Sequence, residues 1–90
     1  MSNRDVIKAF AKRQPARTGL RNIVADGGYR VYKGRTLESD GRELVNYSTV
    51  IARWDGDKVW LNKNKYSVTT SKIQGTLAFE LHQAGIETYN

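Results

Sequence analysis

The sequence predicts a single α+β domain over residues 1–90, with an N-terminal helix, a three- to five-stranded antiparallel sheet and a C-terminal helix packed on one face. Three observations lead to this prediction. Apolar residues recur at helical spacing near both ends of the chain, alternating residues with turn signals dominate the middle, and the 39% hydrophobic fraction is enough for one small core. Helices that lie outside a run of strands are typical of α+β domains.

Residues 1–15 contain the first amphipathic helix, whose helical positions run from 3 to 13. Ser2 or Asn3 provides the N-cap, and Asp5 falls in the first turn, where the helix dipole favours a carboxylate. Pro15 ends the helix. The side that faces the core is formed by Val6, Ile7, Phe10 and Ala11.

Residues 23–62 are expected to form the antiparallel sheet. A first hairpin over 23–33 turns at Asp26–Gly28, and the polar stretch from Gly34 to Gly41 is expected to be a connection. The longest strand is predicted over 43–53. A second hairpin turns at residues 54–57, and residues 58–62 return antiparallel.

Residues 63–70 are predicted to form a basic, hydroxyl-rich loop, and residues 71–84 a second helix. Ser71 and Gln74 have the spacing of a capping box, and Gly85 is a C-cap signal. A short edge strand is expected over 86–89. The apolar stripe of the helix is predicted to contain Ile73, Leu77, Ala78, Leu81 and Ala84.

The net charge of +6 is unevenly distributed. Residues 1–35 contain nine Lys and Arg against two acids, a net charge of +7, whereas residues 36–90 contain six against seven, a net charge of −1. Lys63, Lys65 and Lys72 form a separate basic island. This asymmetry favours a polyanionic partner, an acidic protein surface being an alternative, and a third reading is that the lysines only keep the protein dispersed.

An anion-binding site is predicted where the lysine loop meets the second helix, because a helix N-terminus offers free N–H groups and positive charge. The alternative is that the hydroxyl groups only cap the helix. The candidate residues are Lys63, Lys65, Thr69, Thr70, Ser71 and Lys72. A secondary basic ridge, which is alternatively a solvated surface, is predicted from Arg4, Lys8, Lys12, Arg17 and Arg21.

Three aromatic residues are candidates for stacking on bases, with core or rim packing as the alternative: Trp54, Trp60 and Tyr66. The sequence argues against catalysis and cofactors. It has no cysteine, one histidine (His82) and no phosphate-binding or dinucleotide-binding motif, so we expect no enzyme, no cofactor and no metal site. No apolar run approaches the roughly 18 residues that span a bilayer.

Two blocks of the sequence, Asn46–Arg53 and Asn62–Lys72, resemble a small domain encoded by bacteriophages and prophages. Its signature is Tyr-x-Thr-x-Ile-Ala, a hairpin turn, and then Asn-x-x-Lys-Tyr-Ser-x-Thr-Thr-Ser. The resemblance covers residues from about 5 to 75. A histidine often occupies the position of Ile73 in that family, so its absence here argues against a histidine-dependent reaction. The resemblance implies a phage accessory protein that acts by stoichiometric binding.

These observations predict a phage-encoded binding module that engages nucleic acid or a nucleoprotein through phosphate contacts. The N-terminal residues lack the apolar segment of a signal peptide, and we expect the protein in the cytoplasm of the bacterial host cell. The alternative function is inhibition of a host antiviral defence system, as by an anti-CRISPR protein, through binding to a host defence protein. The sequence leaves the oligomeric state open.

Overall fold

The computed structural model describes residues 2–19, 21–24, 31–34 and 37–90, and it describes no side chains between residues 20 and 36. Two helices and eight strands follow one another along these residues. In chain order they are α1 (Asn3–Ala11), β1 (Pro15–Arg17), β2 (Arg21–Val24), β3 (Val31–Gly34), β4 (Leu37–Asp40), β5 (Glu43–Asn46), β6 (Thr49–Asp55), β7 (Lys58–Leu61), α2 (Val68–Gln83) and β8 (Glu87–Tyr89).

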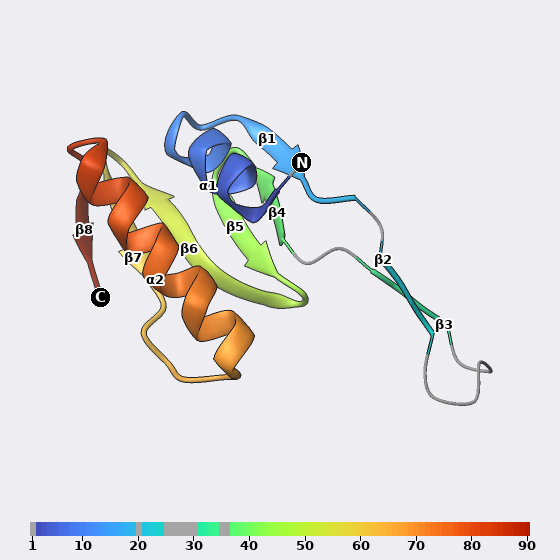
Figure 1. Ribbon diagram of the computed structural model, residues 1–90. Helices are drawn as coiled ribbons and strands as arrows, with labels where there is room; N and C mark the ends of the chain where they lie inside the picture. The colour runs from blue at the N-terminus through green and yellow to red at the C-terminus, as the bar shows by residue number, and fades with distance from the viewer. Residues whose placement is uncertain (1, 20, 25–30, 35–36) are drawn as a thin grey trace.

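The two helices pack side by side on one face of a six-stranded sheet, whose strand order is β1-β4-β5-β6-β7-β8 (Figure 1). The predicted α+β class and the helices on one face are confirmed. The strand number exceeds the predicted three to five, and the sheet is mixed, because β8 pairs with β7 in parallel. The reason is the connection: α2 carries the chain back along the sheet, so the expected edge strand enters in the same direction as β7.

The predicted first hairpin forms, but outside the main sheet. β2 and β3 pair antiparallel from Arg21↔Gly34 to Val24↔Val31 and make a two-stranded sheet of their own. This ribbon extends away from the helices and the six-stranded sheet (Figure 1). The predicted turn at Asp26–Gly28 lies outside the described residues.

β4 occupies a segment that was expected to be a connection, and β1 was not among the predicted strands. β1 pairs with β4, with Ala16 opposite Ser39, and Pro15 is tolerated because β1 is an edge strand. The predicted strand over 43–53 is also wrong as a single element. It is divided into β5 and β6 by a turn at Tyr47 and Ser48, in which Tyr47 adopts the left-handed conformation at φ 56°. The turn lacks the usual glycine, which is why the sequence did not indicate it.

The core lies between the two helices and the inner face of the sheet. Val6, Ile7 and Phe10 of α1 are fully buried, as predicted. In α2 the buried apolar residues are Ile73, Leu77 and Leu81, whereas Ala78 and Ala84 are exposed, against prediction. The sheet contributes Leu37, Leu44, Ile51, Ala52, Trp54, Val59 and Leu61.

Trp54 joins the end of α1 to the centre of the sheet. Its indole N–H donates to the carbonyl of Phe10 at 2.8 Å, and the two rings lie 6.0 Å apart. The guanidinium of Arg13 lies 4.0 Å from the indole centroid and donates to the carbonyl of Gly56. Arg13 reaches this position in a left-handed conformation, φ 58°. One buried ring therefore connects the helix end, the core and the β6–β7 turn.

Hydrogen bonds also fix the ends of the helices. Ser2 and Asp5 form the capping box of α1, in which the N–H of Ser2, and after it the Ser2 hydroxyl, lower the pKa of Asp5 below its usual value. At the end of α2, Gly85 is left-handed at φ 72°, and its N–H donates to the backbone carbonyl of His82. The N–H of Ile86 donates to the backbone carbonyl of Leu81. This pair of bonds is a Schellman motif and confirms the predicted C-cap.

Replacing Trp54 by phenylalanine should lower the free energy of unfolding by about 2–4 kcal/mol, because the change shrinks a core side chain and removes the buried hydrogen bond from the indole N–H to the carbonyl of Phe10. Trp60→Phe is the matched control. Trp60 is half-buried, and the guanidinium of Arg53 lies 5.8 Å from its ring, so the Trp60→Phe substitution should lower the free energy of unfolding by only about 0.5–1 kcal/mol. Urea unfolding of both variants measures the difference; equal losses would contradict the assigned role of Trp54.

Candidate anion-binding site

The second helix begins one turn earlier than predicted. Ser67 is the N-cap, and its hydroxyl accepts from the backbone N–H of Thr70 at 3.1 Å. The predicted capping box of Ser71 and Gln74 is therefore wrong, and the predicted loop over 63–70 is shorter, because its last residues are helical. Both serines are followed three residues later by a polar side chain, so local spacing alone does not separate the two starts.

Thr70 belongs to the interior of the fold. Its side chain is buried, with 4% of the residue exposed, and its hydroxyl donates to the side-chain oxygen of Asn46 at 2.7 Å. The same hydroxyl accepts from the hydroxyl of Ser67 at 3.1 Å. This polar contact explains why the helix starts where it does. The predicted role of Thr70 as an anion ligand is wrong, because its hydroxyl is enclosed and already bonded.

Asn62 organises the loop between β7 and α2. Its side-chain amide donates to the carbonyl of Val50 at 3.0 Å and to the hydroxyl of Tyr66 at 2.9 Å. Its side-chain oxygen accepts from the N–H of Asn64 at 2.9 Å, which is an Asx turn. The loop therefore has a defined backbone path, although Lys63 and Lys65 within it are exposed.

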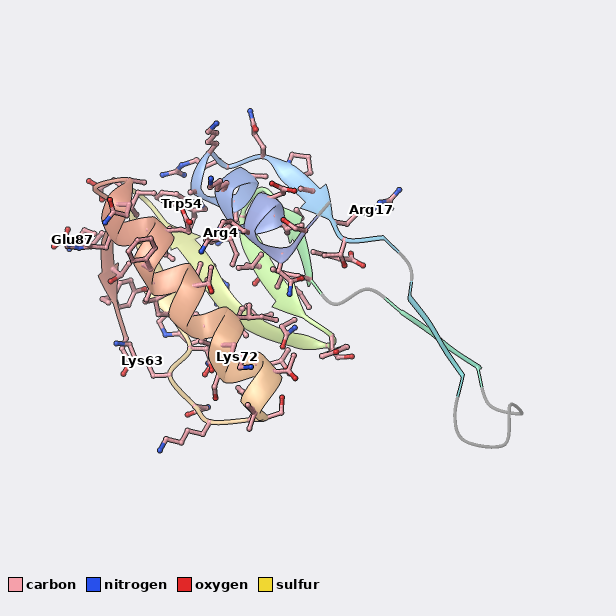
Figure 2. The ribbon with its side chains drawn as sticks, viewed as in Figure 1. Arg4, Arg17, Trp54, Lys63, Lys72 and Glu87 are labelled. Atoms are coloured by element: carbon pink, nitrogen blue, oxygen red, sulfur yellow. The ribbon has the colours of Figure 1, made fainter. Side chains whose placement is uncertain are left out.

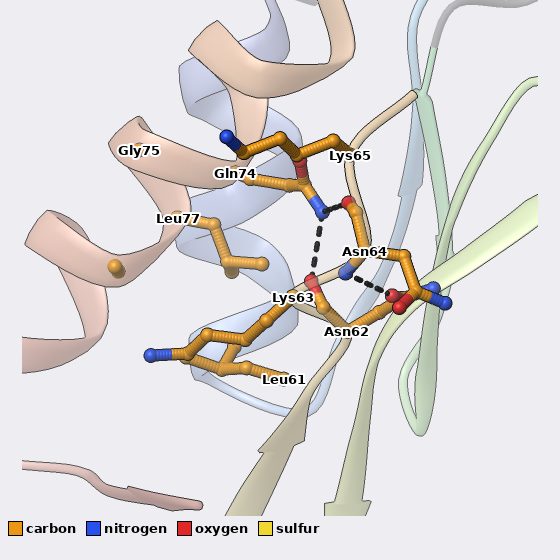
Figure 3. Close-up of a pocket in the computed structure, with 9 residues that line it drawn as sticks. Leu61, Asn62, Lys63, Asn64, Lys65, Gln74, Gly75 and Leu77 are labelled. Carbon is orange, nitrogen blue, oxygen red and sulfur yellow. Dashed lines mark hydrogen bonds between the residues drawn. The ribbon is translucent and has the colours of Figure 1, made fainter. Parts of the chain in front are cut away.

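Gln74 ties this loop to the helix. Its amide nitrogen donates to the carbonyls of Asn62, at 2.7 Å, and Asn64, at 3.1 Å (Figure 3). One helix side chain thus binds two carbonyl groups of the loop. Sequence reasoning assigned Gln74 to a helix cap. The signal for the observed contact was the alternation of Asn62 and Asn64 in the loop, with an amide side chain following in the second turn of the helix.

A surface cavity of about 240 Å³ lies between the loop and α2. Lys63 and Lys65 line it from the loop, and Figure 3 shows their side chains extending on either side of Leu77. Apolar atoms come from Leu61, Leu77 and Ala78. Within the described part of the chain neither lysine has an acidic partner, so the cavity combines an apolar interior with unneutralised positive charge.

Three further candidates lie in the first turns of α2. Thr69, Ser71 and Lys72 are all exposed, and Lys72 has no acidic partner among the residues that the structure describes. The N–H groups of Val68 and Thr69 also lack a partner within those residues. Five of the six predicted site residues are thus exposed, either in the loop before α2 or in its first turns, and Thr70 is the exception.

The predicted basic ridge is not one continuous surface with this site. Arg4 lies between the helices, where its Nε is 3.2 Å from Glu80 Oε1, and therefore has a structural partner. Lys8 and Lys12 are exposed on α1, and Arg17 is exposed on β1. Figure 2 shows Arg17 on the opposite side of the molecule from Lys63 and Lys72. The side chain of Arg21 lies outside the described residues.

The three aromatic candidates have different environments. Trp54 is only 7% exposed, so it packs in the core and is not available for stacking. Trp60 is half-buried beside Arg53, which pairs with it across β6 and β7. Tyr66 is 49% exposed at the end of the lysine loop. Of the three, Tyr66 is the nearest to the site along the chain and the most exposed.

In the part of the chain that the structure describes, no group of three or more His, Cys, Asp or Glu side chains gathers as a metal site would require. None of the described helices has the length and apolar character needed to cross a membrane. No protein-family model matches the chain, and no curated protein or solved structure matches it. The resemblance to the phage domain stays a prediction.

Thr70→Val should lower the free energy of unfolding by about 1–3 kcal/mol, because it removes the hydroxyl that joins Asn46 to Ser67 without changing the side-chain shape. Thr69→Val, at the exposed neighbour, should change it by less than about 0.5 kcal/mol. Both β-branched residues have similar helix propensity, which makes the pair well matched. Thermal and urea unfolding test this; an unchanged Thr70→Val variant would contradict the structural role.

Proposed function

We propose that this protein is a phage-encoded, stoichiometric binding module that engages nucleic acid or a nucleoprotein through phosphate contacts, in the cytoplasm of the bacterial host cell. The observation that most supports the proposal is the grouping of Lys63 and Lys65 around one cavity without acidic partners in the described residues. Phosphate contacts by lysine provide affinity that does not depend on sequence.

The fixed loop strengthens this proposal. Asn62 and Gln74 hold the backbone between β7 and α2 with hydrogen bonds before any ligand arrives. Binding then has to order only the lysine side chains, which lowers its entropic cost. Lys72 and the hydroxyl groups of Thr69 and Ser71 add exposed donors in the first turns of α2.

Binding should weaken steeply with salt. If Lys63, Lys65 and Lys72 each neutralise one phosphate, at a slope of about 0.7–0.9 per phosphate, affinity should fall about 20- to 40-fold between about 50 and 200 mM salt. Fluorescence anisotropy with labelled single-stranded and duplex DNA measures this. Absence of binding to both at low salt would refute the proposal.

A variant with Lys63, Lys65 and Lys72 all changed to glutamine should lose most of this salt dependence and keep its melting temperature. The matched control changes Lys8, Lys12 and Arg17 to glutamine, which removes the same charge from the secondary ridge. We expect the control to retain the larger part of the affinity. If both variants lose affinity equally, net charge and not this site determines binding.

The second candidate function is inhibition of a host defence system, in the manner of an anti-CRISPR protein, by binding a host protein. The exposed apolar side chains of α2 favour it: Val68 is 75% exposed and Phe79 is 55% exposed. Such side chains are common at protein interfaces. Capture of host proteins with the tagged protein before and after nuclease treatment separates the two functions, because a partner that survives nuclease supports direct protein binding.

A further inference from the structure

We propose that the cavity between the lysine loop and α2 accepts one unstacked base of a single-stranded nucleic acid, whose flanking phosphates contact Lys63 and Lys65. This inference rests on the proposed function and specifies its ligand. It is based on a cavity that has apolar walls and two flanking ammonium groups. A phosphate alone would contact the ammonium groups but not the apolar walls.

The volume of the cavity fits one planar ring. An apolar protein cavity of about 150 Å³ accepts benzene, and pockets for drug-sized ligands begin at about 300 Å³. At about 240 Å³ the present cavity lies between these sizes. It is large enough for one nucleobase and too small for several stacked ones.

The lining chemistry also fits a base within a strand. Leu61, Leu77 and Ala78 provide the apolar contacts that a ring face requires, and Gln74 provides an amide at the wall. The nitrogen of this amide is already bonded to the loop, whereas its oxygen has no partner among the described residues. An exocyclic amino group of a base can donate to that oxygen, and an aliphatic side chain of a protein partner cannot.

A duplex does not satisfy the same site. Its bases are paired and stacked, so it presents phosphates to the lysines but leaves the apolar walls of the cavity in contact with water. A single strand presents a free base with a phosphate on each side. The cavity therefore predicts a contribution from the base itself, in addition to the salt-dependent contribution of the phosphates.

Gly75 provides a way to test this contribution. It lines the cavity from α2, and a Cβ atom placed there meets no atom within 4 Å. Gly75→Leu would therefore fill the cavity from a helical position that tolerates a side chain. Gly75→Ala is the matched control, since it also stabilises the helix by replacing a glycine but fills little of the cavity.

The experiment compares a single-stranded DNA oligonucleotide with an abasic strand of the same length and charge, using the full chain at one salt concentration. We expect the intact strand to bind about tenfold more tightly, the scale of one accommodated base elsewhere. Gly75→Leu should bind the intact strand as weakly as the abasic one, with a melting temperature no lower than that of the unchanged protein. Gly75→Ala should keep most of the preference.

Equal binding of the intact and abasic strands by the unchanged protein would overturn the base pocket and leave phosphate binding standing. A preference that survives Gly75→Leu would also overturn it, because the base would then be held elsewhere. Lack of binding to either strand at low salt would overturn it as well, and lack of binding to duplex DNA in addition would refute the proposed function itself.

Discussion

The contact of Trp54 with the end of α1 is the interaction on which the rest of the fold depends. The last carbonyl groups of a helix lack partners within the helix. That of Phe10 accepts from the backbone N–H of Arg13 just beyond the helix and, inside the core, from the indole N–H of Trp54. Arg13 closes the other side of the same ring and reaches the β6–β7 turn. Because β6 is a central strand, this one side chain fixes where α1 lies on the sheet. The position of α1 in turn limits the face that remains for α2, which packs beside it and is joined to it by the Arg4–Glu80 ion pair.

The second helix is placed by polar contacts of a different kind. The buried bond from Thr70 to Asn46 anchors its first turn to β5, and Gln74 anchors the loop that precedes it. Between these two points the chain must leave β7, pass Lys63 and Lys65, and enter the helix at Ser67. The cavity follows from this path, because the loop is held at a distance from the helix by the hydrogen bonds of Gln74 and is not collapsed onto Leu77. The site is therefore a product of how α2 is attached to the sheet.

The sequence predicted those parts of the fold that local signals determine. The first helix, the turn at Gly56 and the end of the second helix at Gly85 all depend on residues within a few positions of one another, and each was predicted. The first helix ends at Ala11, however, and not at residue 13, because Arg13 adopts a left-handed conformation before Pro15 is reached. Elements that depend on distant contacts were missed. β1 and β4 are too short and polar to be recognised without each other, and the choice of Ser67 over Ser71 depends on Asn46, which lies far away in the sequence. The sequence predicted the exposed lysines of the site from their charge and their position in a loop. It did not predict the cavity, because the walls of the cavity come from the end of β7 and the third turn of α2, which are distant in the sequence.

The distribution of acids explains why a site with positive charge occurs in the less basic part of the chain. Residues 36–90 have a net charge of −1, yet Lys63, Lys65 and Lys72 lie in that half. Most acids of this half already interact with other groups: the contacts are Glu80 with Arg4, Glu43 with Arg53, Glu87 with Lys58, Asp55 with the hydroxyl of Tyr89, and Asp40 with the N–H groups of Glu43 and Arg42. The hydrogen bonds from Glu43 and Arg42 lower the pKa of Asp40, and the bond to Asp55 raises the pKa of Tyr89. The field at the start of α2 is thus set by lysines whose charge no acid offsets within the described residues, and net charge counted along the sequence underestimates it.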